Sequence, residues 1–365
     1  MNNYVNLTFM SVNKNFKNAI KYFLSLSIAV VLLYFCFRKI DWLEFWNAFK
    51  ACRWGFVLLS MLAGATAFYV RSSRWRMLLL PIYPETSRIT TFNAVNIGYI
   101  ANLAFSYIGE FVKCGVVTAH SPKEEGEDGN SRRKAPYNKV LGTIVVERSW
   151  DIVSMLIILL TFILLTWKRF GSFFAEEIFG VTAGRLNLSS ILLIAGAILL
   201  VVLLLAAIFK MSRRWKALVP VADFIRGIGN GVTSCLRMEN SWFFFVQTLL
   251  LWCCYWMMSA TILWAVQGID TTAVSADLAS AVGITRGLNL TDAMFLMLAG
   301  AISSVVPVPG GFGAFHFIVA GAISSVYGLP FEFGIIFATL SHESQELNQL
   351  FWGGVSFIIE QFRKD

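Results

Sequence analysis

Residues 303–316, SSVVPVPGGFGAFH, interrupt what would otherwise be one long apolar helix. A proline inside a helix removes an amide donor, and each glycine costs roughly 1 kcal/mol relative to alanine. The flanking residues 293–306 and 314–327 are still apolar enough to lie in a bilayer. Irregular backbone at that depth is tolerated only where it is packed in protein or lines a wet cavity. The sequence therefore predicts a broken helix that forms a site or its wall; a tight turn between two ordinary spanning helices is the alternative.

The remainder of the chain repeats long apolar runs separated by short polar segments. Hydrophobic residues make up 57% of the 365 residues and charged residues 14%, and the mean hydropathy is +0.65. Such values are typical of a polytopic helical membrane protein. The net charge of +8 lies in short loops, where it sets membrane orientation, so nucleic-acid binding is excluded. The six cysteines show no C-x-x-C spacing and predict no disulfide framework.

We expect an all-α polytopic membrane protein in which residues 1–365 form a single integral membrane domain. About six full spanning helices are expected, near residues 20–37, 54–70, 140–167, 189–209, 242–266 and 333–359. Two further segments, 91–119 and 291–328, are predicted to be re-entrant or broken helical hairpins. Residues 121–139, SPKEEGEDGNSRRKAPYNK, are predicted to form a flexible cytoplasmic loop, because they are polar and of mixed charge.

The distribution of Lys and Arg favours two hairpins over two crossings. If residues 91–119 and 291–328 each return to the side from which they enter, most Lys and Arg fall on the side that holds both termini. A single crossing by residues 91–119 would remove this bias. The positive-inside rule therefore predicts cytoplasmic N- and C-termini. The two hairpins then enter from opposite sides and face each other near the midplane, which is the arrangement of inverted repeats.

Several ionisable residues fall inside the predicted membrane segments: Glu110, Lys113, Glu147, Arg148, Asp151, His342, Glu343 and Glu346. Each costs at least ~2.5 kcal/mol at the bilayer centre, so these groups should be paired or face water. Glu110 and Lys113 are three residues apart, and Glu147 and Asp151 are four apart, so each pair shares one helical face. Their clustering near both broken elements favours a transport pathway. Buried ion pairs that only fix helix packing are the alternative.

Three segments, taken together and in order, resemble the membrane domain of the lysylphosphatidylglycerol synthase/flippase family. They are Asn96-Ile97-Gly98 followed by Gly109-Glu110, TIVVERSWD at residues 143–151, and PVPGGFG at residues 307–313. The likeness covers about residues 90–355. It implies a multi-pass protein of the bacterial cell (inner) membrane, whose two re-entrant elements line a cavity for an anionic or aminoacylated phospholipid that moves between leaflets. Full-length synthases carry a soluble aminoacyl-transferase domain after this region, and since the resemblance covers the transport half alone, we expect no enzymatic activity.

Two departures from the family pattern bear on the substrate. Phe105-Ser106-Tyr107 stands where relatives usually carry a proline and an arginine, so one head-group cation is missing, and His316 stands where many relatives have a glutamate. The lipid can therefore differ from that of the synthases. The candidate substrate-binding residues are Glu110, Lys113, Glu147, Arg148, Asp151, Pro307, Pro309, Gly310, Gly311, Gly313, His316, His342 and Glu346.

The break also suggests how a phosphate could be held. Glycines at 310, 311 and 313 open the start of the helix that begins near Ala314, which leaves unpaired amides and the positive end of the helix dipole. Such an end binds phosphate well. We therefore expect a flippase-like protein that translocates a phospholipid or related lipid between leaflets. The alternatives are an ion-coupled transporter of a small polar solute and a non-transporting membrane scaffold for a lipid-modifying enzyme.

Other chemistries are not supported by the residue patterns. His342-Glu343-Ser344-Gln345-Glu346 departs from the zinc-protease motif H-E-x-x-H, because Glu346 takes the place of the second histidine. We expect no metal, no catalytic residue and no cofactor. The sequence contains no P-loop, so transport should be facilitated or ion-coupled. Candidate partners are a membrane phospholipid, further copies of the same chain and a separately encoded lipid-modifying enzyme.

Overall fold

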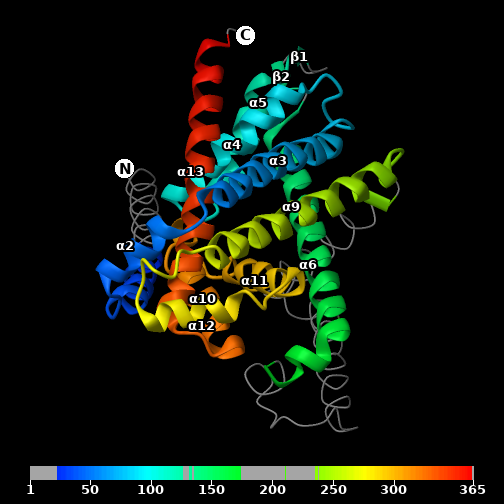
Figure 1. The fold of residues 1–365 in the computed structure, drawn as a ribbon. Coiled ribbons are helices and arrows are strands. Elements are labelled where there is room, and N and C mark those ends of the chain that lie inside the picture. Colours follow the sequence, from blue (N-terminus) through cyan, green and yellow to red (C-terminus); the bar gives the residue numbers. More distant parts are fainter. Residues whose placement is uncertain are drawn as a thin grey trace. The chain divides into compact units, whose positions relative to one another are not determined.

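The computed structural model describes residues 23–125, 131–133, 135–173, 210, 235–236 and 238–363, which are helical apart from one short strand pair (Figure 1). Among the described residues, four segments are long and apolar enough to cross a bilayer: α3 (Trp54–Leu79), Tyr137–Thr166 within α6 (Tyr137–Phe173), α9 (Ser241–Gln267), and Pro309–Tyr327. The helix Phe23–Phe37 and α2 (Trp42–Ala51) make a fifth if they are counted together, although they are bent by 87°. A helical protein with several candidate membrane spans is thereby confirmed.

The finer topology stays a prediction. The expected spans at residues 54–70, 140–167 and 242–266 correspond to α3, α6 and α9. The expected span at residues 189–209 lies outside the described residues. The span expected at residues 333–359 is one long helix, α13 (Phe331–Phe362), which carries a polar middle section and is not among the apolar candidates.

The chain divides into two compact units. One consists of Met1–Leu141 with Val246–Asp365, and the other is Gly142–Phe245. The first unit holds both predicted hairpins and all of α13, while the second holds most of α6. The interpretation of residues 1–365 as a single membrane domain stays a prediction.

Residues 91–119 form two helices with a break between them, as predicted. α4 (Arg88–Ala104) starts at the cap residue Ser87, and α5 (Ile108–His120) starts after Tyr107, which adopts a left-handed conformation with φ 62°. The two helices pack tightly, because a side chain added at Gly109 would collide with the carbonyl oxygen of Gly98. Asn102 Oδ1 accepts a hydrogen bond of 2.7 Å from the Gly109 amide. The N-I-G and G-E segments therefore mark the contact between the two arms of this hairpin.

Residues 291–328 also form a broken hairpin. α11 (Leu290–Ser303) ends before the prolines, the short 3-10 helix η3 (Pro309–Gly311) lies inside the break, and α12 (Ala314–Tyr327) follows. Phe315 packs on Gly300 close to the break. At the other end, the Tyr327 hydroxyl donates a 3.0 Å hydrogen bond to Asp292 Oδ1. The chain therefore reverses at the proline–glycine segment, and α10 (Ala276–Thr285) precedes this hairpin.

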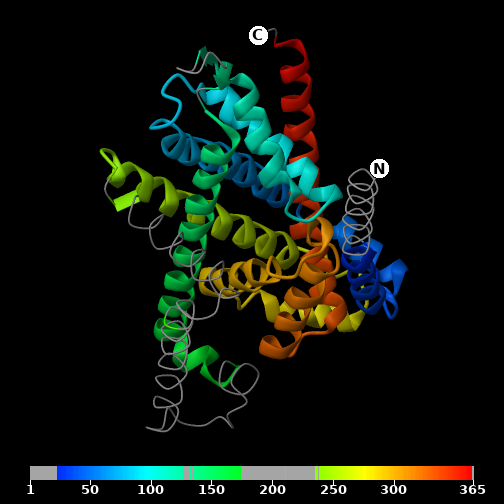
Figure 2. The same cartoon turned by 180° about the vertical axis from the view of Figure 1, so that it is seen from behind.

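α13 connects the two hairpins within the first unit. Figures 1 and 2 show it as one long helix with α4 and α5 beside its C-terminal half and α12 beside its N-terminal half. Gly334 lies against Ala320 of α12, and Gly353 lies against Asn96 and Ile100 of α4. Near its end, Glu360 accepts a 2.6 Å hydrogen bond from Asn93 and pairs with His120 at 2.8 Å. The middle of α13 therefore lies between the part of the helix that contacts the second hairpin and the part that contacts the first.

Part of the predicted cytoplasmic loop is ordered as strands. β1 (Lys123–Glu125) pairs antiparallel with β2 (Ser131–Arg133), and Lys123 lies opposite Arg133. The Ser121 hydroxyl accepts a 2.9 Å hydrogen bond from the amide of Ala135, which closes the base of the loop.

Replacing Gly109 by alanine should separate the arms of the first hairpin. The new methyl group would collide with the Gly98 carbonyl, and overpacking of this kind costs about 1–3 kcal/mol of unfolding free energy. Gly115→Ala on the same helix is the matched control, because a methyl group there meets nothing within 4 Å. The control should be neutral or stabilising by up to about 1 kcal/mol. Thermal unfolding in detergent measures the stability of both variants. Equal unfolding midpoints would contradict the close packing of Gly109 on Gly98.

Candidate functional site

The breaks of the two hairpins meet. The Tyr107 hydroxyl in the first break donates a 2.9 Å hydrogen bond to the carbonyl of Ser304 in the second. Ser25, on the helix Phe23–Phe37, donates a 2.6 Å hydrogen bond to the carbonyl of Pro307 and lies 3.4 Å from the hydroxyl of Ser106. A third element therefore holds both breaks, and carbonyls freed by the interrupted helices receive donors from other segments.

Two helices begin at this meeting point. α5 starts after Tyr107 and α12 starts after Gly313, and within the described chain neither of these residues caps its helix through a side chain. The first turn of a helix presents amide hydrogens and the positive end of the helix dipole. The place where the hairpins meet therefore combines two positive helix ends, an arrangement that attracts anions.

The polar middle section of α13 lies against the second break. His342 Nε2 donates a 2.9 Å hydrogen bond to the carbonyl of Gly310, because a carbonyl oxygen can only accept. The rings of Phe312 and Phe315 each lie 5.1 Å from the imidazole, measured between ring centroids. On the α3 side, Asn348 donates a 2.8 Å hydrogen bond to the carbonyl of Met61. Polar side chains of α13 therefore donate hydrogen bonds to backbone carbonyls of neighbouring elements.

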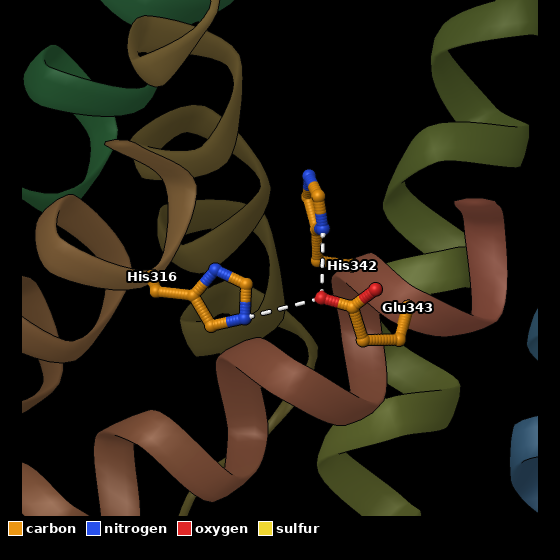
Figure 3. Close-up of side chains that lie close together, drawn as sticks. All are labelled: His316, His342 and Glu343. Atoms are coloured by element: carbon orange, nitrogen blue, oxygen red, sulfur yellow. Dashed lines mark hydrogen bonds and ion pairs between the residues drawn. The ribbon is translucent and has the colours of Figure 1, made fainter. Parts of the chain in front are cut away.

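Glu343 joins two histidines from different helices (Figure 3). Its Oε1 atom lies 3.4 Å from His316 Nε2 and 3.3 Å from His342 Nδ1. The two imidazoles are 1% and 7% exposed, whereas the Glu343 side chain is 37% exposed. On the other side of the His342 ring, Glu346 Oε1 lies 3.7 Å from Nε2. A row of four titratable groups therefore runs from a buried imidazole on α12 along α13.

Among the described residues, this row also contains a group with the donor atoms and spacing to hold a metal ion. One ligand atom each from His316, His342 and Glu343 can be chosen so that all lie within 4.8 Å of one another. The set of candidate residues derived from the sequence included both histidines and Glu346 but not Glu343. The sequence did contain a signal for Glu343, because this residue follows His342 directly in a motif that lacks only the second histidine of H-E-x-x-H.

Glu110 and Lys113 form the predicted pair on α5. The Lys113 ammonium lies 2.8 Å from Glu110 Oε2, and both side chains are largely buried. The same ammonium lies 4.8 Å from the centre of the Trp75 ring on α3, which is within the range of a cation–π contact. This ion pair therefore links the first hairpin to α3 through the Lys113 ammonium.

The other predicted ionisable residues lie on α6 in the second unit. Arg148 Nη1 lies 3.6 Å from Asp151 Oδ2, one turn further along the same helix, and Glu147 is fully buried. Trp150 packs against the rings of Phe244 and Phe245. The structure thus brings His316, His342 and Glu346 to the proline–glycine break, and Glu147, Arg148 and Asp151 belong to the other unit.

Comparison with known families identifies the chain. The family model described as the lysylphosphatidylglycerol synthase TM region matches residues 22–345. The chain belongs to this family. No curated protein and no solved structure matches it. The matched region includes both hairpins and ends in α13 just after the His342-Glu343 pair, so it covers the row of titratable groups except Glu346.

Replacing Gly313 by alanine should displace the helix Phe23–Phe37 from the second break. Gly313 has φ +80°, and a methyl group there would lie 2.8 Å from Leu32 Cβ and 2.9 Å from the Ala29 carbonyl. Gly328→Ala is the matched control, because Gly328 also has a positive φ of +64° but nothing within 4 Å. Both variants should lose about 1–2 kcal/mol through backbone strain, and Gly313→Ala a further 1–3 kcal/mol through crowding.

Cys36 reports this displacement directly. Its thiol is buried and lies 3.8 Å from the Gly313 carbonyl. Maleimide labelling of Cys36, followed by mass spectrometry, should be faster in Gly313→Ala than in Gly328→Ala. Equal labelling rates together with equal unfolding midpoints would show that the first helix does not depend on this contact.

Proposed function

We propose that this protein is a flippase-like transporter that moves an anionic or aminoacylated phospholipid, or a related lipid, between leaflets. The observation that carries the proposal is the meeting of two broken hairpins, recorded by the hydrogen bond from Tyr107 to the carbonyl of Ser304. Membership in a membrane-domain family named for a phospholipid synthase supports a lipid as the substrate. Broken helices inside a membrane domain are the usual place for a substrate site in transporters.

The charges around the breaks suit a head group that carries both signs. The starts of α5 and α12 attract a phosphate, and α5 also carries the buried Lys113 ammonium, which a phosphate could share with Glu110. Glu343 is partly exposed beside the second break and can pair with an ammonium group. An aminoacylated phospholipid presents a phosphate and an ammonium in one head group, so this combination favours that class over a purely anionic lipid.

The acyl chains would remain in the bilayer while the head group passes the breaks. On this proposal the hairpins rock relative to each other and expose the head group to each leaflet in turn. The hydrogen bonds that Tyr107 and Ser25 donate at the breaks end on backbone carbonyls that water or a head group can also satisfy. The protein would act without enzymatic chemistry of its own, in a bacterial inner membrane and with both termini in the cytoplasm.

A second function is favoured by one specific observation, the row His316, Glu343, His342 and Glu346. Chains of His and Glu inside membrane segments are typical of proton relays. An ion-coupled transporter of a small polar solute would use this row to carry protons. It would show proton uptake coupled to the solute and no effect on lipid distribution. A scaffold for a separately encoded lipid-modifying enzyme, or for further copies of the chain, would show neither activity.

Lipid movement can be measured directly in proteoliposomes. In vesicles that contain the protein and fluorescent phosphatidylglycerol, or its lysyl ester, the inner-leaflet lipid should become accessible to external dithionite more slowly when Lys113 is changed to Gln. Loss of a charge-assisted contact worth about 1.5–3 kcal/mol predicts a rate lower by roughly 10- to 100-fold. Lys139→Gln is the matched control, because Lys139 is exposed at the start of α6 and its loss should leave the rate unchanged.

The result separates the hypotheses. Vesicles with the unchanged protein that move lipid no faster than empty vesicles would rule out the flippase. Equal lipid transbilayer rates in Lys113→Gln and Lys139→Gln would show that the charge of Lys113 plays no part in the mechanism. Proton uptake upon addition of a polar solute, without lipid movement, would establish the second function instead.

A further inference from the structure

We propose that His316, His342 and Glu343 form a binding site for one divalent transition-metal ion of the zinc class. The site does not depend on the proposed lipid transport. It assembles a pair of imidazoles and a carboxylate from α12 and α13, beside the proline–glycine break (Figure 3). Two histidines with one glutamate are a donor set that suits zinc and related ions.

The spacing of the three donor atoms fits a metal ion. Glu343 Oε1 lies 3.3 Å from His342 Nδ1 and 3.4 Å from His316 Nε2, and the three residues can each offer one ligand atom so that all lie within 4.8 Å of one another. Three atoms so placed lie about 2.8 Å or less from a common point, and zinc–ligand bonds are about 2.0–2.2 Å long. Ligands of a tetrahedral zinc ion are themselves about 3.3–3.4 Å apart. Both contacts are longer than the usual 2.9–3.0 Å of an N–H···O hydrogen bond.

The hydrogen bonding of His342 is compatible with a metal ligand. Its Nε2 atom donates to the Gly310 carbonyl, so Nδ1 is the ring nitrogen that faces the Glu343 carboxylate at 3.3 Å. Either a proton on Nδ1, which makes a long hydrogen bond to Glu343, or a metal ion removes the repulsion between the two lone pairs. Metal-ligating histidines commonly donate their second N–H to a backbone carbonyl, and the Gly310 contact has this form.

The surroundings of His316 suit a ligand to such an ion. The imidazole is 1% exposed, and its Nε2 atom faces Glu343 at 3.4 Å. This contact is long for a buried polar group, and a metal bond at Nε2 would be a stronger interaction. The Nδ1 atom, on the other side of the ring, has no hydrogen-bond partner within the described part of the chain. The Phe37 ring, 5.7 Å away between centroids, shields this side of the site.

The site can be reached from one side and leaves room for a further ligand. The 37% exposure of the Glu343 side chain gives a path for entry. Three protein ligands on a tetrahedral ion leave one position open to water, as in catalytic zinc sites. The ion would also tie α12 to α13, so binding should raise the thermal stability of the folded protein.

The test uses the full chain, purified in detergent with a histidine-free affinity tag and stripped by a chelator. Titration with Zn²⁺, read by calorimetry and by metal analysis after desalting, should give about one ion per chain and a higher unfolding midpoint. Co²⁺ should show the intense visible absorption of a four-coordinate site. A large excess of Mg²⁺ should not displace either ion, because Mg²⁺ prefers oxygen ligands.

Variants at two of the three donors should strongly weaken this binding. Glu343→Gln and His316→Ala should each weaken Zn²⁺ affinity by more than the roughly 10- to 100-fold that loss of an outer-shell partner costs. The Glu343 side chain is partly exposed, so its isosteric substitution tests the site even if the change at the buried His316 impairs folding. Circular dichroism and gel filtration establish that each variant remains folded and monodisperse.

His120→Ala is the matched histidine control. The chain has three histidines, and His120 pairs with Glu360 at 2.8 Å, outside the cluster. This variant should retain the ion, and so should Glu346→Gln, because Glu346 faces the opposite nitrogen of His342. Absence of bound ion in the unchanged protein, or equal loss of binding in His120→Ala and His316→Ala, would overturn the proposal.

Discussion

Backbone carbonyls freed by broken helices need hydrogen-bond donors, and most of this fold follows from how the chain supplies them. In an apolar environment an unsatisfied carbonyl costs several kcal/mol. Tyr107 donates to Ser304 and His342 donates to Gly310, while Ser25 serves Pro307. Each donor comes from a different element, so the breaks can be stable only when the first helix, the first hairpin and α13 all pack around them.

α13 has the central place in this arrangement because its polar residues lie at its middle. Close contacts made through Gly334 and Gly353 fix its two halves against α12 and α4. The section between them, with His342 and Glu346, then faces the second break. The same placement that satisfies the backbone therefore also concentrates titratable groups where the two positive helix starts meet, which is why one region supports both an anion site and a cation site.

The fold was largely predictable, because its main signals are local. Prolines and positive-φ glycines at residues 307–313 required a break, and apolar runs predicted α3, α6 and α9. The three-residue spacing of Glu110 and Lys113 predicted their pairing. Other features are not local. Tyr107 adopts a positive φ that no residue pattern signals in an aromatic residue, and the polar segment at residues 121–139 contains a short antiparallel strand pair.

The sequence by itself determined the class of the protein, the presence of two broken hairpins and its family, because hydropathy, proline and glycine act within a few residues along the chain. Only the tertiary structure decided which groups share a site. The motif from His342 to Glu346 lacks a second histidine in sequence, yet α12 brings His316 to Glu343 from 27 residues earlier in the chain. Packing of α12 on α13 brings these two residues together, and no local spacing in the sequence encodes that contact.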